Sequence, residues 1–280
     1  MMRRWRTAAA IAILALPVTA APLPHNAWSV VAKPTPGPSQ AIGSTANGCL
    51  SGARELPVDG VGYEVIRLSR HRNFGHADMV DFVASLGRKA HAAGLPLFYV
   101  GDMAQPRGGP LPFGHASHQT GIDVDIWFTA DTRPGLSIAA RETPDLPSMV
   151  LPGGRIDPAR FGPRQVKLLK LAAADPAVDR IFVNPSIKLA LCREFGGATN
   201  GGRAWLHTLR PWFGHDDHFH VRLRCPEGSS ACEPQKPVPD GDGCDAALED
   251  WALHQTPPKA PKQPVEPKVM PAACEQVRTE

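Results

Sequence analysis

Two short segments of the chain gather histidine and aspartate residues. The segment HASHQTGIDVD covers 115–125, the segment GHDDHFH covers 214–220, and together they hold five of the eleven histidines. Imidazole and carboxylate groups are the ligands that zinc and similar borderline metals prefer in proteins. No serine or cysteine nucleophile motif competes with these segments. The residue types therefore predict hydrolysis assisted by a bound metal.

The second segment leads into a predicted strand. Because side chains alternate between the two faces of a strand, His218, His220 and Arg222 share one face. The apolar residues on the other face, which can pack into a core, are Phe219, Val221 and Leu223. This is the pattern expected of a strand that forms the wall of a site. A histidine pair also occurs on exposed strands, so this segment alone leaves both interpretations open.

The first segment favours the metal interpretation. Ile122, Val124 and Ile126 alternate with Asp123, Asp125 and Trp127, so this predicted strand also has an apolar back and an acidic face. His118 would lie about 23 Å from Asp125 in an extended chain, whereas ligands of one zinc ion lie about 2 Å from it. The chain must fold back between them, and Gly121 permits the turn. A cap or a salt bridge is the alternative role for Asp125, but two acids on one strand face usually require a cation.

A metal held by three protein ligands has the pattern of a catalytic site, because a fourth position stays open for water. A further histidine that is not a ligand can take a proton from water and pass it to the leaving amine. The spacing alone permits either His218 or His220 to be the ligand.

The elements around these segments indicate an α+β fold. We expect a small, mainly antiparallel sheet flanked by helices, with long loops and the zinc site on the sheet face. The proline- and glycine-rich range 130–160 is predicted to be a long loop that walls the site. The predicted helices cover 77–93, 163–174 and 186–193. The predicted strands cover 63–68, 97–100, 122–128, 180–183 and 218–223.

The N-terminus is typical of a secretory signal peptide. Three arginines precede an apolar stretch over 8–18, and a small-residue site predicts cleavage after Ala20. The apolar stretch is about half the roughly 20 residues that a membrane span needs, which disfavours an anchor. Three of the 30 basic residues lie in the signal, so the remainder has 27 basic and 27 acidic residues. This balance gives no reason to expect binding to nucleic acid, and we predict no transmembrane span.

The six cysteines indicate export to an oxidising compartment, the bacterial periplasm or the exterior. An even number in an exported chain implies disulfides, and no CxxC pair suggests a structural zinc finger. Cys225 and Cys232 bracket a short polar segment and could close a small loop. Cys274 indicates that the proline- and lysine-rich tail is tied back onto the body. We expect a signal peptide over 1–20, an extended segment over 21–48, a peptidase domain over 49–255 and a tail over 256–280.

The pattern His118-x6-Asp125 followed by His218-x-His220 resembles the metallopeptidase clan of lysostaphin-type peptidases, D-Ala-D-Ala carboxypeptidases and the hedgehog domain. Longer segments are similar to one family, the penicillin-insensitive murein endopeptidases. The segments are HASHQTGIDVDIW at 115–127, WLHTLRPWFGHDDHFHVRLRCP at 205–226, VGDM at 100–103 and RIFV at 180–183. The resemblance runs from about Cys49 to Cys274.

The resemblance implies a role for each site residue. It implies one zinc ion bound by His118, Asp125 and His220, with His218 as general base and with His115 and His215 contacting the substrate or the transition state. It also implies hydrolysis of D-alanyl–diaminopimelate cross-links between peptidoglycan stem peptides, with L,D cross-links as a further substrate. Penicillin would not inhibit, because no serine is acylated. The disulfides it implies are Cys49–Cys274, Cys192–Cys244 and Cys225–Cys232.

Two positions depart from the pattern of the relatives. The wider clan often has a small residue at Asp123, which here either orients a ligand histidine or pairs with a nearby arginine. Asp217 stands where we expect an aromatic residue, and its charge could raise the pKa of His218.

Three other functions are compatible with parts of the pattern. They are a zinc D,D-carboxypeptidase, a wall-binding zinc module without catalysis, and an iron oxygenase with two histidines and one carboxylate. Having both His215 and His218 argues against the inactive module. The six residues between His118 and Asp125 argue against the oxygenase, in which one residue usually intervenes.

Overall fold

The two predicted site strands pair at the centre of the molecule. In the computed structural model, which describes residues 23–131, 135–195, 202–256 and 269–280, β8 (Asp123–Asp131) runs antiparallel to β13 (His218–Leu223). Their register places His220 directly opposite Asp125. The predicted signal peptide over 1–20 lies outside the described residues.

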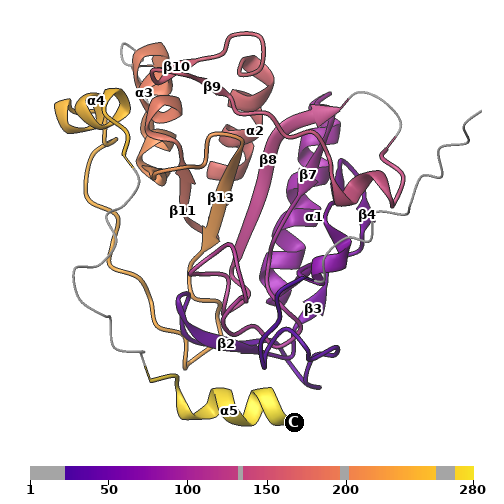
Figure 1. Ribbon diagram of the computed structural model, residues 1–280. Coiled ribbons are helices and arrows are strands. Elements are labelled where there is room, and N and C mark those ends of the chain that lie inside the picture. The colour runs from indigo at the N-terminus through magenta and orange to yellow at the C-terminus, as the bar shows by residue number, and fades with distance from the viewer. Residues whose placement is uncertain (1–22, 132–134, 196–201, 257–268) are drawn as a thin grey trace, which may run out of the picture.

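The central sheet confirms the predicted α+β fold. Among the described residues it has seven strands, in the order β12-β11-β13-β8-β7-β5-β4. Figure 1 shows β11, β13, β8 and β7 side by side at its centre. The pairs β11–β12 and β5–β7 are parallel and the other four pairs are antiparallel. The strands beside β8 and β13 are β4 (Asp59–Gly60), β5 (Tyr63–Val65), β7 (Leu97–Val100), β11 (Val178–Val183) and β12 (Leu209–Pro211).

Three helices form close to the predicted positions. They are α1 (Ala77–Ala92), α2 (Pro163–Ala173) and α3 (Pro185–Phe195). The side chain of His76 accepts a hydrogen bond from the backbone N–H of Asp78 and so caps α1 at its start. Beyond the end of α1, Gly94 has φ +73°, a conformation that favours glycine and ends the helix.

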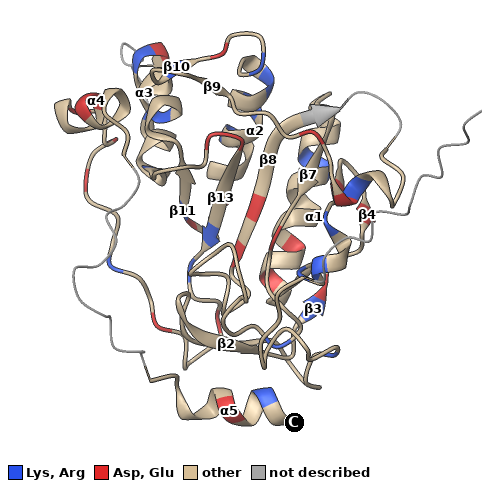
Figure 2. Ribbon diagram, in the orientation of Figure 1, with Lys and Arg blue, Asp and Glu red and all other residues tan. Residues whose placement is uncertain are grey.

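The two faces of the β8–β13 pair have different environments, as the alternation of the sequence predicts. Val124, Ile126, Phe219 and Val221 are fully buried and pack with the apolar sides of α1, α2 and α3 in the main core. The opposite face of the same two strands carries acidic, basic and histidine side chains, among them Asp123, His220 and Arg222. Figure 2 shows acidic positions along β8 in red and a basic position on β13 in blue. Burial of the apolar face therefore sets which way the polar residues point.

Some elements differ from the prediction. The strand predicted over 63–68 ends at Val65, because Arg67 has φ +56° and a 3₁₀ turn follows at Leu68–Arg70. The predicted loop over 130–160 includes a 3₁₀ turn, Ala140–Glu142, and a two-stranded sheet, β9 (Val150–Leu151) with β10 (Arg155–Ile156).

The N-terminal part also contains more regular structure than predicted. Within the extended segment predicted over 21–48, β1 (Gln40–Ser44) pairs antiparallel with β2 (Asn47–Ser51). A second small sheet pairs β3 (Arg54–Glu55) with β6 (Phe74–Gly75). These strands are short and rich in small residues, so they lack the apolar alternation that identifies a longer strand.

Two of the three disulfides tie the C-terminal part to the body, and the third closes a short loop. All three join the pairs that the resemblance implies: Cys49–Cys274, Cys192–Cys244 and Cys225–Cys232. The first attaches the helix α5 (Ala272–Thr279) to β2, and the second attaches the start of the segment before α4 (Ala246–Leu253) to α3. In the described part of the chain, no helix has both the length and the apolar character needed to cross a membrane.

Candidate active site and metal centre

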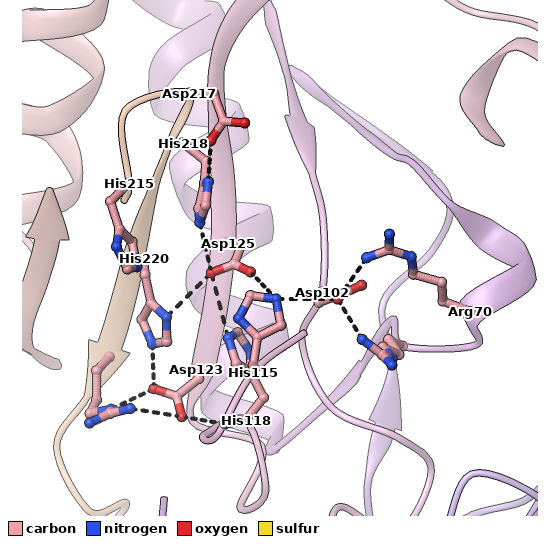
Figure 3. A network of polar contacts seen from close by, with 12 residues as sticks. Arg70, Asp102, His115, His118, Asp123, Asp125, His215, Asp217, His218 and His220 are labelled. Carbon is pink, nitrogen blue, oxygen red and sulfur yellow. Dashed lines mark hydrogen bonds and ion pairs between the residues drawn. The ribbon is translucent and has the colours of Figure 1, made fainter. Parts of the chain in front are cut away.

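Asp125 lies at the centre of a cluster of imidazole rings on the polar face of the sheet (Figure 3). Its side chain is almost fully buried, and its Oδ1 atom has no hydrogen-bond partner among the described residues. Three ring nitrogens surround Oδ1: His220 Nδ1 at 3.3 Å, His118 Nε2 at 3.5 Å and His218 Nε2 at 3.8 Å. We call these four residues the Asp125 cluster. Burial would raise the pKa of Asp125, but the nearby histidines His118, His218 and His115 hold it well below its ordinary value.

His118 reaches this cluster from the loop before β8. The chain folds back at Gly121, which has φ +72° and where a Cβ atom would lie 2.4 Å from Leu50 Cδ2. The turn predicted at this glycine is therefore present. His118 itself has φ +67°, and its backbone N–H donates to Asp123 Oδ2 at 3.0 Å. Its ring is fully buried and neither ring nitrogen has a hydrogen-bond partner.

Asp123 joins three polar groups beneath the Asp125 cluster. Its Oδ1 accepts hydrogen bonds from His220 Nε2 at 2.8 Å and from Arg222 Nε at 2.5 Å, and its Oδ2 accepts from the backbone of His118. We call Asp123, the His220 ring, Arg222 and the backbone N–H of His118 the Asp123 cluster. Burial would raise the pKa of Asp123, but Arg222 and His220 outweigh it and lower the pKa far below its ordinary value.

The hydrogen bond to the ionised Asp123 determines which ring nitrogen of His220 carries the proton. A carboxylate can only accept hydrogen bonds, so His220 Nε2 must carry the proton. The neutral ring then presents the lone pair of Nδ1 to Asp125, as a metal ligand requires. Asp123 thus contacts both kinds of partner considered for it, a histidine and an arginine.

His115 lies between two carboxylates at the edge of the cluster. Its Nε2 is 3.3 Å from Asp125 Oδ2 and 3.4 Å from Asp102 Oδ2. Asp102 also accepts hydrogen bonds from Arg72 Nη1 at 2.7 Å and Arg70 Nη1 at 2.9 Å. Burial would raise the pKa of Asp102, but His115 and the two arginines lower it below its ordinary value.

Asp102 is a site residue to which the sequence analysis assigns no role. It lies two residues beyond the end of β7 in the segment VGDM, and an acid just after an apolar strand was the available signal in the sequence.

His218 and His215 complete the ring cluster. Burial disfavours a charged imidazole, but the carboxylates of Asp125 and Asp217 outweigh it and raise the pKa of His218 above its ordinary value. His215 has no adjacent carboxylate in hydrogen-bond contact, and its Nδ1 donates to the carbonyl of Phe213 at 3.1 Å. Burial, His218 and His220 lower the pKa of His215 to about 3, so the ring is neutral near pH 7.

The arrangement presents a candidate metal-binding group. One donor atom each from His115, His118 and Asp125 lie within 4.8 Å of one another. His220 Nδ1 offers a further donor 3.3 Å from Asp125 Oδ1. Among the described residues, His118 Nε2 and Asp125 Oδ1 have no hydrogen-bond partner and lie 3.5 Å from each other, and such buried atoms are costly unless an ion or water satisfies them. Two imidazole nitrogens and a carboxylate oxygen suit a borderline divalent cation.

A cavity of about 440 Å³ opens beside this group. His115, His215 and His220 line one part of it, and the aromatic rings of Phe182 and Trp212 line another. Half of the Trp212 side chain is exposed to solvent. The histidines thus face a space large enough for a peptide segment.

Comparison with known proteins gives one family along nearly the whole chain. The family model described as penicillin-insensitive murein endopeptidase matches residues 41–279. This range contains all five site histidines and all six cysteines.

Curated relatives with the same description are matched over most of their own length as well. A protein of Haemophilus influenzae is 44% identical over 272 residues, which is 95% of this chain and 92% of the relative. A protein of Klebsiella pneumoniae is 42% identical over 265 residues, covering 95% of both chains. A protein of Yersinia pestis is 40% identical over 274 residues, covering 98% of this chain and 96% of the relative. Each of these relatives is described as a penicillin-insensitive murein endopeptidase.

Proposed function

The chain belongs to the penicillin-insensitive murein endopeptidase family, and from this membership we propose that it is a zinc-dependent peptidoglycan endopeptidase. Its substrates are D-alanyl–diaminopimelate cross-links between stem peptides, with L,D cross-links as a second substrate. The reaction needs no acylated serine and is therefore insensitive to penicillin.

One observation carries this proposal: Asp125 Oδ1 has three imidazole nitrogens within 3.8 Å and no hydrogen-bond partner. A protein that used these groups only for stability would pair them, because an unpaired buried polar atom costs about 1–3 kcal/mol. We propose His118, Asp125 and His220 as the ligands of one zinc ion. His115 is not chosen because its Nε2 already contacts Asp102, and Arg70 and Arg72 anchor that carboxylate.

A bound zinc ion would supply Lewis acidity for the attack of water on the amide carbonyl. The residues of the chain supply the rest. His218 Nε2 is buried, without a partner and 3.8 Å from Asp125 Oδ1, so it can take a proton from the attacking water and return it to the leaving amine. His115 and His215 face the cavity beside this point and contact the substrate or the transition state.

We also propose that residues 49–255 act as the peptidase domain and that the protein works in the periplasm. The three disulfides support an oxidising compartment. The tail over 256–280 would then serve to hold the N-terminal strands, since Cys274 on α5 is joined to Cys49 on β2.

Purified muropeptides test the reaction directly. The full mature protein is incubated with D,D-linked and with L,D-linked disaccharide-peptide dimers, with and without penicillin, and the products are separated by chromatography. We expect monomers from the D,D-linked dimer at the same rate in both conditions, and none from the variant His220→Ala. Release of terminal D-Ala alone would replace the proposal with a carboxypeptidase, and binding to wall sacculi without release would replace it with a binding module.

Removal of the metal tests the cofactor. The protein as purified should contain about one zinc ion per chain by elemental analysis, as one three-ligand site requires. A chelator should abolish monomer release and added zinc should restore it. Iron in place of zinc, or full activity after chelation, would overturn the proposed cofactor.

A further inference from the structure

Asp217 is in direct contact with the ring of the proposed general base. Its Oδ1 lies 2.6 Å from His218 Nδ1, the shortest contact that the His218 ring makes with a described residue (Figure 3). The two residues are neighbours in the chain, and Asp217 immediately precedes β13. This contact uses one ring nitrogen and leaves the other, Nε2, buried and without a partner on the side of Asp125.

The contact selects one tautomer of His218. An ionised carboxylate only accepts hydrogen bonds, so the proton of the neutral ring must lie on Nδ1. The lone pair is then on Nε2, which is the nitrogen that faces Asp125. A base needs its lone pair at the reacting centre, so the tautomer with the proton on Nε2 would be inactive.

The surroundings hold both partners of this contact in place. The backbone carbonyl of Asp217 accepts a hydrogen bond from the backbone N–H of Phe128 at 3.0 Å, which joins it to β8. The ring of His218 packs against Trp127 with ring centroids 4.8 Å apart and against His215 at 4.9 Å. The side chain of Asp217 is 31% exposed, so it reaches the ring from the solvent side while Nε2 stays buried.

We propose that Asp217 is a positioning residue that fixes His218 as the Nδ1–H tautomer, with Nε2 directed at the reacting centre. This inference rests on the proposed function, because it assigns His218 the role of the base. Asp217 itself does not touch the substrate: it acts through His218. It serves His218 as Asp123 serves His220, each carboxylate holding a proton on the ring nitrogen that points away from the centre.

Three substitutions separate this role from simple packing. Asp217→Ala removes the acceptor. Asp217→Asn keeps the size, but its amide can either accept from Nδ1–H or donate to Nδ1, so it no longer selects one tautomer. Asp217→Glu restores a carboxylate, and the partial exposure of this side chain leaves room for one more methylene. The matched control is Asp216→Ala, which removes the neighbouring carboxylate, whereas the backbone carbonyl of Asp216 keeps its bond to the N–H of Met149.

The first readout is kinetic, on D,D-linked muropeptide dimers with zinc-loaded full-length mature protein. We expect Asp217→Ala and Asp217→Asn to lower kcat by about 10–100-fold, the usual effect of losing a partner that orients a site residue, with KM within about twofold. Asp217→Glu should recover at least half of the activity that Asp217→Ala loses, measured as the change in log kcat. Asp216→Ala should match the wild type, and all variants should keep about one zinc ion per chain.

The second readout is the tautomer itself, from long-range ¹H–¹⁵N correlation spectra of the histidine rings. His218 is assigned as the signal missing in His218→Ala. Its Nδ1 should carry the proton in the wild type and in Asp217→Glu, whereas Asp217→Ala should shift the population toward the tautomer with the proton on Nε2. Wild-type kcat in Asp217→Ala, or an unchanged His218 tautomer in it, would overturn the inference. A wild-type protein that does not release monomers would instead overturn the proposed function, because the tautomer is measured without substrate.

Discussion

Asp123 and Asp125 lie on the same face of β8, two residues apart, and both are buried, yet their surroundings are opposite. Both oxygens of Asp123 accept hydrogen bonds, and Arg222 balances its charge. Asp125 Oδ1 accepts none, although three imidazole nitrogens lie within 3.8 Å of it. The Asp123 cluster is thus a closed polar network, whereas the Asp125 cluster has buried lone pairs that the protein leaves unpaired.

This difference distinguishes residues that hold a site in place from residues that can bind a ligand there. Buried polar groups in proteins are nearly always paired, so a group of unpaired atoms indicates a position for a ligand. The Asp123 cluster forms hydrogen bonds with two members of the Asp125 cluster, the ring of His220 and the backbone of His118, and we expect it to orient them. Partners of this kind keep metal ligands in place before the metal binds.

The largest effect is expected from the ligands of the open cluster. His118→Ala and His220→Ala should each remove the bound zinc and reduce monomer release below detection, because three ligands are the minimum of a catalytic zinc site. Metal content by elemental analysis and product release are measured on the same samples. A variant that keeps both zinc and activity would remove that histidine from the ligand set.

His218 belongs to the same cluster but should behave differently. His218→Ala should keep about one zinc ion per chain and lose about 10²–10⁴-fold in kcat, the usual contribution of acid–base catalysis. The measurement is kcat beside metal content. Loss of metal equal to that of His220→Ala would show that His218 is a ligand and that the base is assigned to the wrong ring.

Breaking the closed cluster should mainly affect stability and metal affinity. Asp123→Asn leaves the guanidinium of Arg222 buried without its counter-charge, which should lower the free energy of unfolding by about 3–5 kcal/mol. Zinc affinity should fall about 10–100-fold, because His220 loses its orienting partner. Urea unfolding and competition with a zinc chelator measure the two effects.

The double variant Asp123→Asn/Arg222→Met is the control for this prediction. It removes both buried charges and should regain part of the lost stability without regaining zinc affinity. Recovery of both quantities would mean that Asp123 only balances the charge of Arg222 and does not orient His220.

The smallest effect is expected at Asp102, which lies outside both clusters. Asp102→Asn should reduce kcat by at most about tenfold and leave zinc affinity unchanged, because the side chain of Asp102 contacts His115, Arg70 and Arg72 but none of the proposed ligands. The same two assays apply. A clear loss of zinc affinity would favour His115 as a ligand in place of His220.

The two strands that carry the site residues were predictable from short-range patterns in the sequence. Alternation over 122–128 and 218–223 indicates an apolar face and a polar face, and burial of Val124, Ile126, Phe219 and Val221 confirms it. The turn at Gly121 follows from the distance between His118 and Asp125, and the structure has it. The short strands β1 and β2 were not predicted, because their residues carry no alternation that distinguishes them from extended chain.

The sequence by itself therefore determined the types of the site residues and the face on which each strand residue lies, since both are properties of neighbouring positions. Only the tertiary structure decided which groups remain unpaired. Asp123 meets Arg222 and His220 because β8 and β13 pair in one register, and Asp102 meets His115 because the strand β7 ends beside the loop before β8. The pairing of strands far apart in the chain depends on the packing of the whole sheet, and no local pattern of residues encodes it.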